Sequence, residues 1–106
     1  MKNIGILGGT FDPPHIGHLI IAEEVRERIS LEEVWFIPTY LPPHKENANS
    51  SVKDRLNMVS LSLEGNPYFR INPIETKQQI ASYTINTMEE LTGQHPEIDF
   101  HFIIGA

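Results

Sequence analysis

Short apolar segments alternate with segments of helical periodicity along this chain of 106 residues, and this alternation restricts the fold more than any other feature. The apolar segments have the length of buried strands, whereas between them apolar side chains recur every three or four residues. We expect strands at Ile4–Leu7, Glu33–Ile37, Phe69–Asn72 and Ile98–Ile104, and helices at Ile16–Ile29, Val52–Glu64 and from Ser82 or Thr84 to Leu91. Strands and helices in this order predict an α/β fold of the Rossmann-like type, with a parallel sheet, right-handed crossovers and helices on both faces.

Glycine and proline mark the expected ends of the helices. Gly65, followed by Asn66-Pro67, supplies a C-cap glycine and a proline stop for the second helix. Gly93 is expected to end the third helix. Trp35 and Phe36 are expected in the core of the sheet.

Length, charge and composition restrict the classes of protein to which this chain can belong. A chain of 106 residues, 40% apolar and 21% charged, has the size and composition of one globular domain. The formal net charge of −6 argues against a nucleic-acid partner, which needs clustered Lys and Arg. The chain has no cysteine, which excludes a disulfide framework, a thiolate nucleophile and a Cys-based zinc site. It has no signal-peptide pattern and no apolar run long enough to span a membrane, so we expect no membrane association and a cytoplasmic location.

The last residues, Gly105-Ala106, follow directly on a very apolar predicted strand, where folds of this type normally continue into another helix. We therefore expect residues 1–106 to form a single domain that is incomplete at its C-terminus. The edge of the last strand would then be unpaired, which favours self-association, so a homo-oligomer is an expected partner.

The turn between the first strand and the first helix carries most of the functional information. It begins with Gly8-Gly9, which removes two β-carbons where the backbone would approach a ligand, and it leads into a helix N-terminus that favours an anion. Neither G-x-G-x-x-G nor G-x-x-x-x-G-K-[ST] occurs here. The turn therefore predicts a phosphate site of another kind.

Two histidines strengthen that prediction. His15 and His18 are three residues apart at the start of the predicted helix, with Gly17 between them, so both can lie on one face beside the phosphate site. Imidazole N–H groups there could stabilise charge that builds on a phosphorus atom. The alternatives are a solvated or core-capping pair of histidines, and a metal site, for which no neighbouring third ligand is present.

The stretch Gly8-Gly9-Thr10-Phe11-Asp12-Pro13-Pro14-His15-Ile16-Gly17-His18 resembles the H-x-G-H signature of the nucleotidyltransferase superfamily, in the form found in bacterial nicotinate mononucleotide adenylyltransferases. Other segments resemble the same family: Trp35-Phe36-Ile37-Pro38, Pro42-Pro43-His44-Lys45, Arg55-Leu56, Ser82-Tyr83-Thr84 and Phe102-Ile103-Ile104-Gly105-Ala106. The resemblance implies transfer of AMP from ATP to nicotinate mononucleotide, which yields nicotinate adenine dinucleotide and pyrophosphate, with Mg²⁺ as cofactor. Two alternatives are a sister transferase, acting on phosphopantetheine or with CTP, and a non-catalytic nucleotide-binding module.

The resemblance also implies roles for individual residues. It assigns catalysis to His15, His18 and Lys45, and contacts with ATP or its phosphates to Gly8, Gly9, Thr10, Phe11, His15, Gly17, His18, His44, Lys45 and Gly105. It places Tyr83 and Thr84 at the nicotinate mononucleotide and assigns no protein residue as a metal ligand. Read without the family, His44-Lys45 is a solvated loop pair, and Tyr83-Thr84 is a helix cap with its packing neighbour.

The chain departs from the family pattern in two places. Ala81 stands where the family usually has a proline before Ser-Tyr-Thr. The later family segments are absent: an Asp after Gly-Ala, an aromatic segment at the nicotinate ring and a Ser-rich motif with an Arg that binds ATP. We therefore expect the 106 residues to be inactive when assayed alone.

Overall fold

The computed structural model describes residues 2–9, 16–38, 52–74 and 85–103, without the side chains at positions 52, 55, 85 and 86. Within these ranges the elements follow one another as β1 (Lys2–Gly9), α1 (Ile16–Arg28), β2 (Glu33–Pro38), α2 (Val52–Leu63), β3 (Phe69–Ile71), α4 (Ile85–Gln94) and β4 (Ile98–Ile103). The predicted alternation of strands and helices is confirmed. No described helix is long and apolar enough to cross a membrane.

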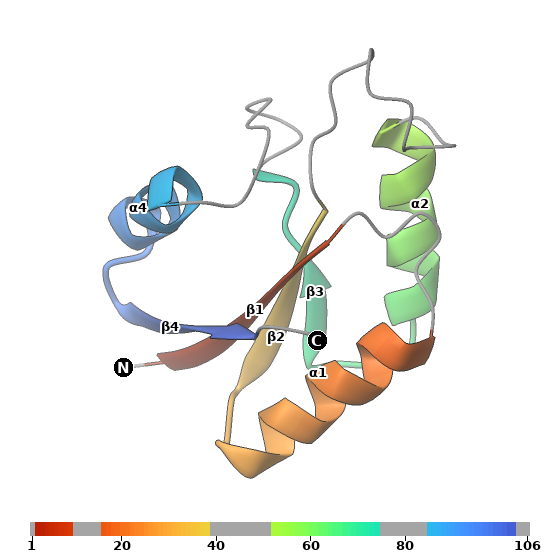
Figure 1. The fold of residues 1–106 in the computed structure, drawn as a ribbon, viewed down its shortest axis with the longest axis horizontal. Helices are drawn as coiled ribbons and strands as arrows, with labels where there is room; N and C mark the ends of the chain where they lie inside the picture. Colours follow the sequence, from red (N-terminus) through yellow and green to blue (C-terminus); the bar gives the residue numbers. More distant parts are fainter. Residues whose placement is uncertain (1, 10–15, 39–51, 75–84, 104–106) are drawn as a thin grey trace.

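The four strands form one parallel sheet in the order β3-β2-β1-β4 (Figure 1). Helices α1 and α2 cover one face of the sheet, and α4 covers the other. The prediction of a Rossmann-like parallel sheet with helices on both faces is therefore confirmed. The strand order places β1 in the interior of the sheet, between β2 and β4.

Side chains alternate between the two faces along each strand and so build two cores. On the face of α1 and α2, Leu7 of β1 and Phe36 of β2 pack with Ala22, Val59 and other buried residues. On the face of α4, the buried cluster consists of Ile4, Ile6, Ile37, Ile74, Leu91 and Ile98. The expected core role of Phe36 is confirmed because its side chain is 1% exposed, and Trp35 packs against the second core.

Gly5 allows β1 to pack tightly between its neighbours. A Cβ at this position would lie 2.7 Å from Leu31 Cδ1 and 3.1 Å from Ile103 Cδ1. The side chains of Leu31 and Ile103 therefore fill the space above Gly5.

Helix ends follow the predicted signals except at Gly93. Gly65 ends α2 with a φ of +85°, a conformation that glycine adopts without strain. The expectation for Gly93 is wrong, because Gly93 lies inside α4, which continues to Gln94. The backbone N–H of His95 still bonds to the Leu91 carbonyl at 2.9 Å, and Pro96 then prevents a further turn.

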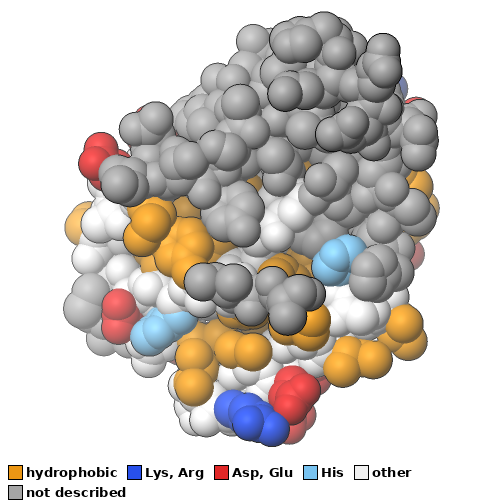
Figure 2. Space-filling view, viewed as in Figure 1, with side chains coloured by type: hydrophobic (Ala, Val, Ile, Leu, Met, Phe, Trp, Pro, Cys, Tyr) orange, Lys and Arg blue, Asp and Glu red, His pale blue; other side chains and the backbone are white. Residues whose placement is uncertain are grey.

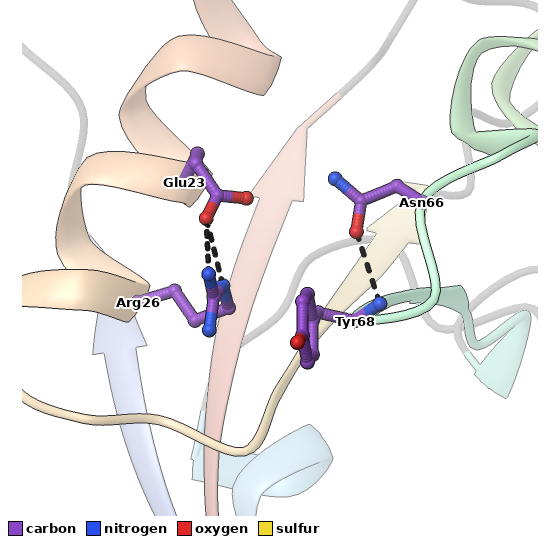
Figure 3. A network of polar contacts seen from close by, with 4 residues as sticks. All are labelled: Glu23, Arg26, Asn66 and Tyr68. Carbon is purple, nitrogen blue, oxygen red and sulfur yellow. Dashed lines mark hydrogen bonds and ion pairs between the residues drawn. The ribbon is translucent and has the colours of Figure 1, made fainter.

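A polar network joins α1 to the turn between α2 and β3 (Figure 3). Arg26 Nε donates to Glu23 Oε1 at 2.9 Å, and the Arg26 guanidinium lies 4.0 Å from the centre of the Tyr68 ring. Within the turn, the backbone N–H of Tyr68 donates to Asn66 Oδ1 at 2.9 Å. The Arg26 side chain is 18% exposed and Tyr68 is 45% exposed, so this cation–π contact lies at the surface and is partly shielded from solvent.

This network predicts how stability depends on acid. The hydrogen bond from Arg26 lowers the pKa of Glu23 below its ordinary value of 4.5. The resulting stabilisation is complete above pH 4.5 and is lost as the pH falls through the lower folded-state pKa. We expect Glu23→Gln to be less stable than the wild type at pH 7, with the difference shrinking towards pH 3, as measured by urea unfolding at both values. Glu24→Gln, which breaks the exposed pair with Arg28, is the control, and an equal pH dependence in both variants would contradict the prediction.

A second polar cluster joins β2 to β3. Glu33 accepts hydrogen bonds from Trp35 Nε1 at 3.0 Å and from Arg70 Nε at 2.9 Å. Desolvation raises the pKa of Glu33, but the two hydrogen bonds outweigh it, so the net pKa lies below the ordinary value. The carboxylate is therefore ionised at neutral pH and ties the edge strand β3 to the sheet.

Candidate functional site

The carboxyl ends of all four strands meet at one edge of the sheet. Gly8 and Gly9 of β1 pair with Ile37 and Pro38 at the end of β2, and Leu7 pairs with Ile103 at the end of β4. Ligands of open parallel sheets bind at this edge, outside the carboxyl ends of the strands. The candidate site therefore begins at the end of β1.

The strand order indicates where along the carboxyl edge of the sheet a ligand would bind. From β1 the chain passes through α1 to β2, which pairs with one side of β1. β4 follows α4, the helix on the opposite face of the sheet, and pairs with the other side of β1. The direction of the strand order thus reverses between β1 and β4, and a crevice opens at such a switch point. Gly8 and Gly9 lie beside it. They were expected in the turn after the first strand, but they continue β1 as its last two residues because they still pair with Ile37 and Pro38 of β2.

The first turn of α1 belongs to the same edge. A helix that connects two parallel strands runs antiparallel to them, so its N-terminus lies at their carboxyl ends. This turn contains Gly17 and His18, both half-buried, and it has no acidic residue. The N-terminal turn of a helix carries the positive end of the helix dipole. An anion at the end of β1 would therefore be stabilised by this turn.

Some acidic side chains of the described residues lie at the edge of the sheet opposite the candidate site. Among the described helices, α1 and α4 have no acid in the first turn, and α2 has Asp54 next to Lys53. Glu32, Glu33, Glu97 and Asp99 lie instead where β2 and β4 begin, at the opposite edge. These four carboxylates therefore do not lie beside a phosphate bound at the candidate site.

Of the predicted site residues, the structure describes Gly8, Gly9, Gly17 and His18. The others lie outside the described residues: Thr10, Phe11, His15, His44, Lys45, Tyr83, Thr84 and Gly105. Residues 10–15, 39–51 and 104–106 directly follow β1, β2 and β4, and residues 75–84 follow β3 after Asn72, Pro73 and Ile74. These four segments lie outside the described residues, so the roles of their residues stay predictions.

The described residues contain no group of three His, Asp or Glu side chains that could hold a metal ion. A divalent cation at this site would need other ligands. Phosphate oxygens and water are the usual ones for Mg²⁺ in nucleotide sites.

Comparison with known proteins agrees with this geometry. A family described as "Cytidylyltransferase-like" matches residues 6–106. The chain belongs to this family. As in the sequence-based prediction, its members are nucleotidyltransferases, and the match includes the end of β1 with Gly8 and Gly9, the start of α1, and the strands β2, β3 and β4.

Curated relatives cover the whole chain. It is 53% identical over 106 residues to a protein of Oceanobacillus iheyensis and 54% identical over 107 residues to one of Bacillus mycoides, both named "Probable nicotinate-nucleotide adenylyltransferase". These alignments cover 100% of this chain but 56% and 57% of the two relatives, so the chain spans about half their length. The predicted resemblance to this group is confirmed.

Solved structures confirm the fold. A crystal structure from Vibrio parahaemolyticus matches with a TM-score of 0.79 at 24% identity and covers 100% of this chain and 59% of its own. A Plasmodium falciparum nicotinic acid mononucleotide adenylyltransferase, described in complexes with APC and with NaAD, matches with TM-scores of 0.76 and 0.75 at 20% identity. The likeness extends over nearly all of this chain and about half of each neighbour.

Proposed function

We propose that this chain carries the ATP-phosphate site of a nicotinate-nucleotide adenylyltransferase. The observation that supports this most strongly is the identity of 53–54% along the entire chain with relatives named for that activity. The switch-point position of Gly8 and Gly9, beside the first turn of α1, supplies a site of the right chemistry. A cytoplasmic location is part of the same proposal.

The proposed reaction is a direct displacement at phosphorus. A phosphate oxygen of nicotinate mononucleotide attacks the α-phosphorus of ATP, and the bond from that phosphorus to the bridging oxygen breaks. Nicotinate adenine dinucleotide and pyrophosphate are the products. No covalent enzyme intermediate is needed, so catalysis consists of positioning the two nucleotides and stabilising charge on the phosphoryl oxygens.

The described residues supply two parts of that stabilisation. Gly8 and Gly9 let the triphosphate approach the backbone, and the first turn of α1 provides N–H groups and its dipole. His18 donates a hydrogen bond to a phosphate oxygen as charge builds in the transition state. In the proposal, His15 and Lys45 share this role, while Thr10, Phe11, His44 and Gly105 contact ATP, and Tyr83 and Thr84 contact nicotinate mononucleotide.

Mg²⁺ is the proposed cofactor. It would arrive bound to the ATP phosphates and neutralise part of their charge, which is its common mode in nucleotide sites.

A chimaeric enzyme tests the proposal. Residues 1–106 of this chain replace the 106 aligned residues of the Oceanobacillus iheyensis relative, and the intact relative is the positive control. We expect the chimaera to form nicotinate adenine dinucleotide and pyrophosphate from ATP and nicotinate mononucleotide, and formation to stop when Mg²⁺ is chelated. A folded chimaera without activity, beside an active intact relative, would overturn the proposal.

The family description favours one alternative, a transferase that uses CTP. The same chimaera distinguishes the two functions when CTP replaces ATP. We expect turnover with ATP and none with CTP. The reverse preference would assign the chain to the cytidylyl-transferring members of the family.

A further inference from the structure

Three residues form one row along α1, with His18 near its start, Ala22 at its middle and Arg26 near its end. Residues four apart in an α-helix lie on the same side, so the row runs nearly parallel to the helix axis. Ala22 is fully buried in the core between α1 and the sheet, His18 is half-buried, and the Arg26 side chain is 18% exposed. The rotation of α1 about its own axis therefore sets the directions of His18 and Arg26 together.

Apolar side chains occur all round α1, so burial alone specifies its rotation weakly. Leu19, Ile21 and Val25 pack against the core, but Ile16 and Ile20 on the other side of the helix are apolar too, and they are 72% and 56% exposed. Figure 2 shows hydrophobic side chains on the surface at the lower right of the view, where α1 lies, near a basic and an acidic side chain. A helix with a single apolar stripe has one favoured rotation, whereas apolar residues all round reduce that preference. A directional contact can then select the rotation.

Arg26 makes such a directional contact with the turn that precedes β3. Its guanidinium lies 4.0 Å from the centre of the Tyr68 ring, and its Nε donates to Glu23 Oε1 at 2.9 Å (Figure 3). Tyr68 is itself held by its backbone, because its carbonyl accepts from the Val34 N–H of β2 at 2.8 Å and its N–H donates to Asn66 Oδ1 at 2.9 Å. The ring is thus attached to the sheet, and the contact fixes the end of α1 relative to the sheet.

We propose that Arg26 is a positioning residue: its contact with Tyr68 fixes the rotation of α1, and thereby the direction in which His18 donates to the ATP phosphates. The role of His18 at the phosphates rests on the proposed function, whereas the rotation of α1 does not. Eight residues of helix separate Arg26 from His18 by about 12 Å, so Arg26 acts through the helix and not by contact with the nucleotide. A small misplacement of a catalytic donor costs a large part of its effect on rate.

Substitution of either contact partner in the chimaeric enzyme tests the inference. Arg26→Met removes the guanidinium but keeps an unbranched side chain, and we expect kcat to fall about tenfold with KM for ATP changed by less than about twofold. Tyr68→Leu removes the ring and should cause the same loss. The double variant should lose no more than either single variant, because each change breaks the same contact. A folded Arg26→Met enzyme with kcat within about twofold of the unsubstituted chimaera would overturn the inference.

Two matched variants control for loss of charge and for changes at Tyr68. Arg28 lies in the same last turn of α1 as Arg26, but its side chain is 75% exposed and pairs with Glu24 at 2.8 Å on the surface. Arg28→Met should therefore leave kcat within about twofold of the unsubstituted chimaera. Tyr68→Phe keeps the ring face that the guanidinium contacts and should also retain kcat within about twofold. A loss in Arg28→Met equal to that in Arg26→Met would contradict the proposal.

A second double-variant comparison separates positioning from a purely structural role. In the His18→Ala chimaera, Arg26→Met should cause no further fall in kcat, because the side chain through which Arg26 acts is already absent. A structural role would lower kcat by the same factor with and without His18. Circular dichroism verifies that each variant is folded at the assay temperature. Equal losses in the two backgrounds would refute the assignment of Arg26 as a positioning residue.

NMR spectroscopy reads the surroundings of His18 without catalysis. In the chimaera, isotope-labelled at histidine, the resonance that disappears in His18→Ala identifies the His18 ring. We expect Arg26→Met to shift this resonance and Arg28→Met to leave it in place. An unchanged His18 resonance in folded Arg26→Met would overturn the inference. A chimaera that is inactive, but in which the resonance still shifts, would overturn the proposed function and leave the effect of Arg26 on α1 supported.

Discussion

Replacing His18 by alanine is expected to lower kcat/KM for nicotinate adenine dinucleotide formation by the chimaeric enzyme about 10²–10³-fold, the usual loss when one donor to a developing oxyanion is removed. His18 lies in the first turn of α1, at the carboxyl edge of the sheet where the proposed triphosphate binds. Because its hydrogen bond strengthens as charge builds, most of the loss should fall on kcat rather than on KM. Steady-state kinetics with ATP as the varied substrate measures both constants.

A matched histidine elsewhere in the fold controls for nonspecific effects. His95 follows α4 and precedes β4, at the opposite edge of the sheet, and its ring lies edge-on to Trp35 at 5.3 Å. His95→Ala should leave kcat within about twofold of the unsubstituted chimaera, since surface changes far from a site have small effects. Equal losses in both variants, or an unchanged rate in His18→Ala, would contradict the assigned role.

The largest expected effect on stability comes from Phe36. Its side chain is 1% exposed in the core beneath α1 and α2, and its ring centre lies 5.2 Å from that of Phe69. Phe36→Ala should lower the free energy of unfolding by about 3–5 kcal/mol, the combined cost of lost burial and of the cavity that remains. For a domain of this size the corresponding fall in Tm is at least about 12 °C.

An exposed leucine provides the control for this substitution. Leu61 of α2 is 67% exposed, so Leu61→Ala should change the free energy of unfolding by less than about 0.5 kcal/mol. Thermal and urea unfolding of both variants give the comparison. A Phe36→Ala protein as stable as the Leu61→Ala protein would show that this core does not contribute as its burial indicates.

The candidate site could be predicted from sequence to the extent that its signals are local. Gly8, Gly9, Gly17 and His18 lie close together in the sequence, and the structure places the two glycines at the end of β1 and the other two residues in the first turn of α1. The placement of Glu32, Glu33, Glu97 and Asp99 at the opposite edge was not evident, because it depends on the direction in which each strand crosses the sheet. The cation–π contact between Arg26 and Tyr68 was also missed, since 42 positions of sequence separate two residues that only tertiary packing brings together.

The sequence by itself determined the nature and order of the elements. Apolar periodicity, the glycine at position 65 and the prolines act within a few residues of the chain, so they specify local structure without reference to partners. Gly93 shows the limit of such signals, because α4 continues through it to Gln94. Tertiary structure alone decided the strand order β3-β2-β1-β4, which sets the switch point beside Gly9 and leaves β4 at an edge of the described sheet. Which strands become neighbours in the sheet depends on the burial of both sheet faces and on the geometry of the crossover connections. No single segment of the sequence encodes either property.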